Sequence, residues 1–185
     1  MFEGRATGVM GNHEWKILRW LKGNDVTLSN PNMPTIEAME KQPILKDMFT
    51  RYTERLSFNL KLSEKMFVAH AAIKPDWWTS RTDTKKTEAY NRYGNSDSSK
   101  LIDFRGERYP IRLYNWVDEV PNDVRLLVGH DPRPMIGEPD FDNFQPTPTS
   151  VKNKQGGITT FLDGGSGKGG LLWGAVVNSA NNSIE

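Results

Sequence analysis

The sequence of 185 residues suits one globular domain over residues 1–185, long enough to bury a core. Hydrophobic residues make up 36% and charged residues 25%, and the formal net charge of +1 provides no strong field for nucleic acid or a membrane surface. Cysteine is absent, which excludes disulfides, thiolate zinc sites and cysteine nucleophiles, and no apolar stretch approaches the roughly 20 residues of a membrane span. A cytoplasmic protein without a membrane partner is therefore expected.

The N-terminal third is predicted to be mainly helical. A short apolar run over residues 6–10 predicts a strand, and Gly11 then allows a tight turn into a helix that Gly23 closes. A second helical region is expected over residues 35–56, and Pro43 should divide or kink it because proline breaks the helical hydrogen-bond pattern.

The middle of the chain predicts two strands and a long loop. Residues 57–62 alternate polar and apolar side chains, as a half-buried strand does, and residues 66–70 form a run typical of a buried strand that ends on a histidine. Residues 74–100 are polar, so a surface loop with one helical turn is expected there.

The C-terminal third predicts three more strands, over residues 125–128, 158–162 and 171–177. Four prolines mark an irregular loop over residues 132–146, and the glycine-rich residues 163–170 join the last two strands. Mixed strands and helices predict an α/β or α+β class in a layered arrangement.

The only three histidines, His13, His70 and His130, each lie at or just beyond the C-terminal end of a predicted strand. A single histidine is more often a structural or surface residue. Three in the same position indicate a site, because ligands bind at that edge of open α/β sheets and catalytic residues concentrate on loops held by a sheet.

The neighbours of the histidines favour a metal. Asn12 precedes His13 and offers an amide oxygen beside the imidazole, and small residues flank His70 and leave space for an ion. An oxygen donor with neutral imidazoles suits Mn²⁺, Fe²⁺ or Zn²⁺ better than Ca²⁺.

Four motifs in this order resemble those of the calcineurin-like metallophosphoesterase family. Each motif is weak alone, but together they span nearly the whole chain and are specific. Within the family they are similar to the compact bacterial and phage branch of Ser/Thr protein phosphatases, diadenosine tetraphosphatases and polynucleotide kinase-phosphatase phosphatase domains. The motifs are Gly11-Asn12-His13-Glu14, strand–His70–Ala71, Val128-Gly129-His130-Asp131-Pro132 and Leu162-Asp163-Gly164-Gly165.

The resemblance implies a two-layer β-sandwich flanked by helices, with metal ions in the loops at the edge of the sheets. Asn12, His70 and His130 resemble the ligands of one ion, for which Mn²⁺ is expected first and Fe²⁺, Zn²⁺ or Ni²⁺ are alternatives. A metal-bound hydroxide would attack phosphorus in line, without a covalent enzyme intermediate.

The resemblance also implies roles for three further residues. His13 corresponds to a histidine that helps to stabilise the transition state, with protonation of the leaving oxygen as a further role. Asp163 corresponds to an acidic residue that supports the site. In relatives an arginine of the region that here contains Arg105, Arg108 and Arg112 can clamp phosphate, with solvated surface arginines as an alternative of at least equal weight; among the three, Arg112 is the preferred candidate.

The family's Asp-x-His and Gly-Asp-x-x-Asp-Arg-Gly motifs do not occur in the sequence. This predicts an N-terminally truncated or split family member, in which a partner chain or self-association covers the exposed sheet edge. Asp131 or Asp163 would then supply a substitute carboxylate for one ion.

The expected function is therefore a metal-dependent phosphatase that hydrolyses phosphomonoesters of a phosphoprotein, a nucleotide or a nucleic-acid end. The alternative is a catalytically inactive remnant that serves as a binding or structural module.

Three other features have simpler explanations. The glycine-rich run around Lys168 lacks the phosphate-loop pattern and predicts a hairpin turn. Trp77 and Trp78 are expected in the core, with an aromatic wall for a nucleobase as the alternative. Glu14 is expected to be a favourable charge near a helix N-terminus.

Overall fold

A computed structural model describes residues 6–104, 107–131, 147–166, 170–178 and 183–184. The helices are α1 (Asn12–Leu21), the 3-10 turn η2 (Asn30–Asn32), α2 (Met33–Lys41), α3 (Ile44–Thr53), α4 (Trp77–Ser80), α5 (Lys85–Tyr93) and the 3-10 turn η3 (Asn115–Glu119). The strands are β1 (Asn59–Ser63), β2 (Met66–Ala69), β3 (Asn95–Phe104), β4 (Glu107–Leu113), β5 (Arg125–Val128), β6 (Thr149–Lys152), β7 (Ile158–Phe161), β8 (Val177–Asn178) and β9 (Ser183–Ile184).

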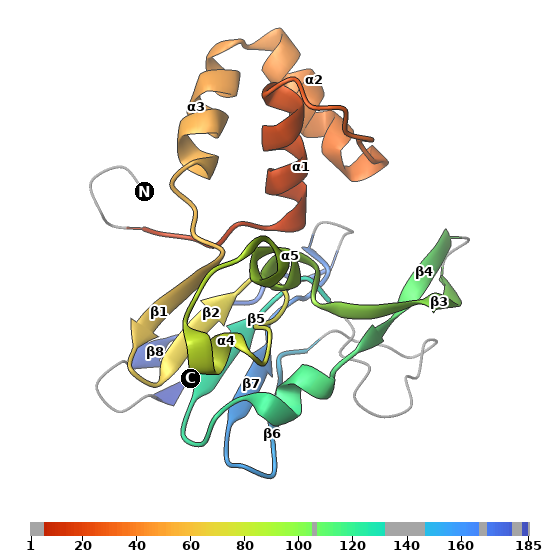
Figure 1. Cartoon of the computed structure of the whole chain (residues 1–185). Coiled ribbons are helices and arrows are strands. Elements are labelled where there is room, and N and C mark those ends of the chain that lie inside the picture. The colour runs from red at the N-terminus through yellow and green to blue at the C-terminus, as the bar shows by residue number, and fades with distance from the viewer. Residues whose placement is uncertain (1–5, 105–106, 132–146, 167–169, 179–182, 185) are drawn as a thin grey trace.

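A five-stranded sheet in the order β1-β2-β5-β7-β6 forms the centre of the fold (Figure 1). Its middle strands β2, β5 and β7 are parallel, and β1 and β6 pair antiparallel at its two edges. Two further two-stranded sheets are β3-β4 and β8-β9. This mixture of sheets and helices confirms the predicted α+β class.

Strands β2 and β5 are rich in apolar residues, as is usual for parallel strands with both faces covered. Met66, Phe67 and Leu126 are fully or almost fully buried, and Phe67 meets the rings of Trp77 and Trp78 edge to face. Both tryptophans belong to the core cluster around the sheet, as the sequence favoured. The aromatic wall for a nucleobase is not formed by them.

Helices α1, α2 and α3 stand together at one end of the sheet, whereas the β3-β4 hairpin extends away from it (Figure 1). The helices bury their apolar side chains in small clusters of their own, one of which contains Ile17, Ile36 and Met39. The second helical region divides at Pro43, as predicted, because that proline begins α3.

Three predicted elements differ from the structure. Residues 6–10 contribute only a single bridge, between Val9 and Ser57. Residues 74–100 are not a long loop but hold α4, α5 and the beginning of β3, because Thr84 and Thr87 form a capping box that starts α5. Residues 171–177 do not form one strand: Leu171 makes a single bridge with Gly165, residues 172–176 lie outside any strand with Leu172 87% exposed, and Val177 begins β8.

Two predictions lie outside the described residues: the irregular loop over residues 132–146 and the tip of the glycine-rich turn at Lys168. Nearer its base, that turn closes with a bridge between Gly165 and Leu171. Among the helices that the structure describes, none has the length and apolar character needed to cross a membrane.

Candidate active site

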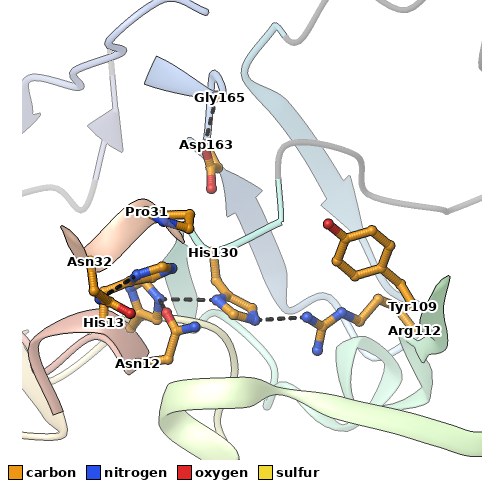
Figure 2. Close-up of a pocket in the computed structure, with 10 residues that line it drawn as sticks. Asn12, His13, Pro31, Asn32, Tyr109, Arg112, His130, Asp163 and Gly165 are labelled. Carbon is orange, nitrogen blue, oxygen red and sulfur yellow. Dashed lines mark hydrogen bonds between the residues drawn. The ribbon is translucent and has the colours of Figure 1, made fainter. Parts of the chain in front are cut away.

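One cavity of about 430 Å³ brings together all six residues that the sequence singled out (Figure 2). Helix α1, the β4 strand and the ends of three sheet strands each contribute to its wall. Its lining residues are Asn12, His13, Pro31, Asn32, His70, Tyr109, Arg112, His130, Asp163 and Gly165.

The sheet positions three of these residues through its strand register. Ala69, Val128 and Phe161 are paired across β2, β5 and β7, so the residues that follow them leave the same edge of the sheet. The Gly129 amide donates to the His70 carbonyl at 2.9 Å, which continues the pairing beyond the strands. His70, His130 and Asp163 therefore emerge side by side at the carboxyl ends of parallel strands.

His130 has a backbone φ of 69°, in the left-handed region. Histidine is one of the few side chains other than glycine that enters this region with some frequency, and such residues often occur at functional sites. The next residue, Asp131, accepts a hydrogen bond from the Tyr114 hydroxyl and is not part of the cavity lining. Asp163 is thus the better placed of the two carboxylates considered as substitute ligands.

Gly11 allows α1 to begin against the His70 ring. A Cβ at this position would lie 3.2 Å from the ring atoms of His70 and 2.2 Å from a carboxylate oxygen of Glu14. Asn12, the first residue of α1, can therefore bring its side chain to the imidazole of His70. Glu14 lies in the first turn of α1, as predicted.

The side chains of Asn12, His70 and His130 converge. The Nε2 atom of His70 lies 3.0 Å from Oδ1 of Asn12 and 3.0 Å from Nδ1 of His130. Burial lowers the pKa of His70, and burial with the nearby His70 and Arg112 lowers the pKa of His130 to about 3. Both rings are therefore neutral at pH 7, and each offers a lone pair.

With the amide oxygen of Asn12 facing His70, the protons of these groups leave one pair of acceptors without a hydrogen between them. Arg112 can only donate, and its Nη2 lies 3.0 Å from Nε2 of His130, so the hydrogen of that ring sits on Nδ1 and points at His70. Nε2 of His70 then accepts, and the oxygen of Asn12 faces it as a second acceptor.

A cation would resolve this conflict because it attracts both acceptors. Ligand atoms about 2.1 Å from an ion and at right angles to each other lie about 3 Å apart, which is the spacing found here. The residues fit a borderline divalent ion by donor chemistry and by spacing. The described residues contain no group of three or more histidine, cysteine or carboxylate side chains that could hold a metal, so the amide of Asn12 is needed to complete a set of three.

The remaining predicted residues occupy the rim of this arrangement. Oδ1 of Asp163 accepts from the Gly165 amide at 2.8 Å, which fixes the carboxylate at the end of β7. Arg112 donates through Nη1 to the Tyr93 carbonyl at 2.7 Å, and its Nη2 contacts His130 in the cavity. Arg108 does not line the cavity, and Arg105 lies outside the described residues.

Asn32 is one of the cavity-lining residues that the sequence did not predict, with Pro31 and Tyr109. Its side chain is 1% exposed, and its Nδ2 lies 3.0 Å from Nδ1 of His13 (Figure 2). The local signal was Ser29 and Pro31, which indicate a turn, but nothing in the pattern relates this turn to a histidine 19 residues earlier.

The fold and the cavity define an α+β protein with an imidazole-lined site at the carboxyl ends of parallel strands, where ligands bind in sheets of this kind. No protein-family model matches the sequence.

Curated relatives are more informative. The chain is 30% identical over 139 residues to a bis(5'-nucleosyl)-tetraphosphatase PrpE [asymmetrical] of Bacillus cereus. The aligned region covers 72% of this chain and 52% of that protein. Proteins of the same name from Bacillus mycoides and Bacillus anthracis are 29% identical over 143 and 139 residues, with the same coverage. The chain spans about half the length of these relatives. These relatives are named as phosphoesterase-type hydrolases, and the similarity supports the calcineurin-like phosphoesterase superfamily.

Proposed function

We propose that this chain is a metal-dependent phosphoesterase that hydrolyses phosphomonoesters, with a divalent ion held by Asn12, His70 and His130. The observation that carries the proposal is the convergence of Oδ1 of Asn12 and Nδ1 of His130 on Nε2 of His70, each at 3.0 Å, with no hydrogen between the Asn12 oxygen and the His70 nitrogen. Mn²⁺ is the first choice, because this donor set suits borderline ions and Mn²⁺ also accepts oxygen ligands. The activity named for the relatives supports the hydrolase class.

The bound ion would supply a nucleophile from water at neutral pH and positive charge for the phosphoryl oxygens. The chain's own residues then bind and orient the substrate. Arg112 offers a guanidinium at the cavity wall, where it can pair with phosphoryl oxygens. His13 offers an imidazole to an oxygen of the reacting group, and Asp163 supports the site from the end of β7.

The substrate is a phosphorylated molecule such as a phosphoprotein, a nucleotide or a nucleic-acid end. The name of the relatives adds bis(5'-nucleosyl) tetraphosphates as a second class to test. The competing function is a binding module without catalysis, with or without a partner chain. The lining residues alone do not select among the substrates.

Two measurements test the proposal. Calorimetry with MnCl₂ should show binding to the wild-type protein and its loss in His70→Ala. Release of p-nitrophenol from p-nitrophenyl phosphate with Mn²⁺ should exceed the rate of His13→Ala, and hydrolysis of bis(5'-adenosyl) tetraphosphate is followed in parallel by chromatography. Equal background rates of both proteins on both substrates favour the binding module, and absence of Mn²⁺ binding rules out the metal site.

A further inference from the structure

Asn32 is a buried polar residue whose contacts determine how it presents its side chain. It ends the short turn η2, between α1 and α2, and its side chain is 1% exposed. A polar group buried this deeply is normally fully hydrogen-bonded, so the direction of its oxygen and nitrogen follows from its neighbours.

The amide oxygen of Asn32 is fixed by two donors from one residue. Ser29 donates to Oδ1 from its backbone N–H at 3.2 Å and from its hydroxyl at 2.9 Å. Rotating the amide by half a turn would place its NH₂ group against the N–H of Ser29, donor against donor. The nitrogen of Asn32 must therefore be the atom that meets His13.

This orientation assigns the hydrogen of the His13 ring. Nδ2 of Asn32 can only donate, so Nδ1 of His13, 3.0 Å away, accepts. A neutral imidazole carries one hydrogen, which consequently sits on Nε2. A hydrogen on Nδ1 would point directly at the hydrogens of Asn32.

We propose that Asn32 is a positioning residue that holds His13 in the tautomer with its hydrogen on Nε2. In this form His13 presents its Nε2–H to the substrate as a hydrogen-bond donor. The inference deepens the proposed function, because the role of His13 toward a phosphoryl or leaving oxygen rests on it.

The chain offers a nearly isosteric variant that isolates this contact. Asn32→Asp keeps the oxygen that binds Ser29, so the turn is retained, but it places an acceptor opposite Nδ1 of His13. Asn30→Asp is the matched control, because Asn30 lies in the same turn, is exposed and adds the same charge.

Tautomers are read from long-range proton–nitrogen NMR spectra of the metal-free full chain labelled with ¹⁵N-histidine. Only three histidines contribute, and a His13→Gln sample assigns the signals of His13. We expect the hydrogen on Nε2 in the wild type and in Asn30→Asp, and on Nδ1 in Asn32→Asp. A wild-type hydrogen on Nδ1, or the same tautomer in Asn32→Asp as in the wild type, overturns the inference.

Steady-state kinetics with Mn²⁺ and p-nitrophenyl phosphate separate this inference from the proposed function. We expect Asn32→Asp to lower kcat by at least about tenfold with little change in KM, as loss of an orienting partner does in other sites, and Asn30→Asp to match the wild type. A normal kcat in Asn32→Asp contradicts the positioning role even if the tautomer changes. If the wild type has the expected tautomer but no activity, the proposed function fails and the role of Asn32 in catalysis fails with it, whereas the hydrogen-bond assignment stands.

Discussion

The two halves of the cavity wall are built in different ways. The strand half presents His70, His130 and Asp163 from adjacent parallel strands, whose backbone hydrogen bonds set the spacing of the three residues. The helix half presents Asn12 and His13 from the start of α1, which packs in clusters separate from the core of the sheet.

This difference suggests a division of tasks. Residues spaced by backbone register suit a metal ion, which tolerates little error in the distance between its ligands. The helix half offers the proposed ion a single ligand, Asn12. Its second residue, His13, is oriented by the side chain of Asn32 in the turn η2. The following predictions test that division, from the largest expected effect to the smallest.

Removal of a proposed metal ligand from the strand half should affect metal binding far more than removal of His13, the proposed catalytic residue. We expect His70→Ala to weaken Mn²⁺ binding by more than about 100-fold and His13→Ala to change it by less than about threefold, because ligand loss exceeds the effect of outer partners. Isothermal titration calorimetry measures both. Similar losses in the two variants would contradict the division between the halves.

The contact between the halves should depend on the absence of a side chain at Gly11. The Cβ of Gly11→Ala would lie 3.2 Å from the His70 ring, which Asn12 and His130 hold in place. We expect Mn²⁺ affinity and kcat/KM to fall by about tenfold or more, as small misplacements at reacting centres do.

Gly129→Ala is the control on the strand half, because its nearest neighbour would be the His70 carbonyl at an ordinary 3.6 Å. Equal effects of the two alanines would show that Gly11 is not specially constrained.

The strand half should make stability depend on pH. Burial lowers the pKa of His130 to about 3 from the ordinary 6.5 that unfolding restores, so the unfolded chain binds more protons between these values. Stability is then full above about pH 6.5 and falls as the pH decreases, by up to about 1.4 kcal/mol per pH unit for this one group.

Urea unfolding of the metal-free protein at several pH values measures this dependence. His130→Asn, which tolerates the same backbone conformation, should show a shallower slope between about pH 6 and pH 4. Identical slopes for the two proteins would assign the acid sensitivity to other groups.

The smallest effect is expected at Arg112, which contacts the proposed metal ligand His130 and also lines the cavity where a substrate would bind. An ion on Nδ1 of His130 requires the ring hydrogen on Nε2, where Arg112 now donates, so ion binding and this contact compete. We expect Arg112→Ala to bind Mn²⁺ about three- to tenfold more tightly, because it also removes a nearby positive charge. Arg108→Ala, on the same strand but outside the cavity, should bind like the wild type. Weaker binding by Arg112→Ala would contradict the competition.

The central strands could be predicted from the sequence because short local runs of apolar residues define them. The sequence predicts strands over residues 66–70 and 125–128, and the structure gives them as Met66–Ala69 and Arg125–Val128, one residue shorter in the first case. Their parallel pairing then brings His70 and His130 together, so this half of the cavity followed from strand ends alone.

Other parts depended on contacts that no local pattern encodes. The β3-β4 hairpin, over 95–104 and 107–113, is rich in polar residues and is held by pairing between its strands rather than by an apolar face. Residues 171–177 have a strand-like composition but stay exposed, because no sheet edge pairs with most of them. Asn32 meets His13 across a turn, and such side-chain contacts leave no periodicity in the sequence.

The left-handed backbone at His130 limits which ligands this position can offer. Asparagine, aspartate, histidine and glycine enter that region with some ease, whereas other side chains cost about 1 kcal/mol or more there. Of the common metal-binding side chains, glutamate and cysteine are therefore disfavoured at residue 130 before any coordination chemistry is considered. Attempts to redesign the site for a softer or harder ion have few substitutions to choose from here, and aspartate is the replacement that the backbone accepts with a carboxylate.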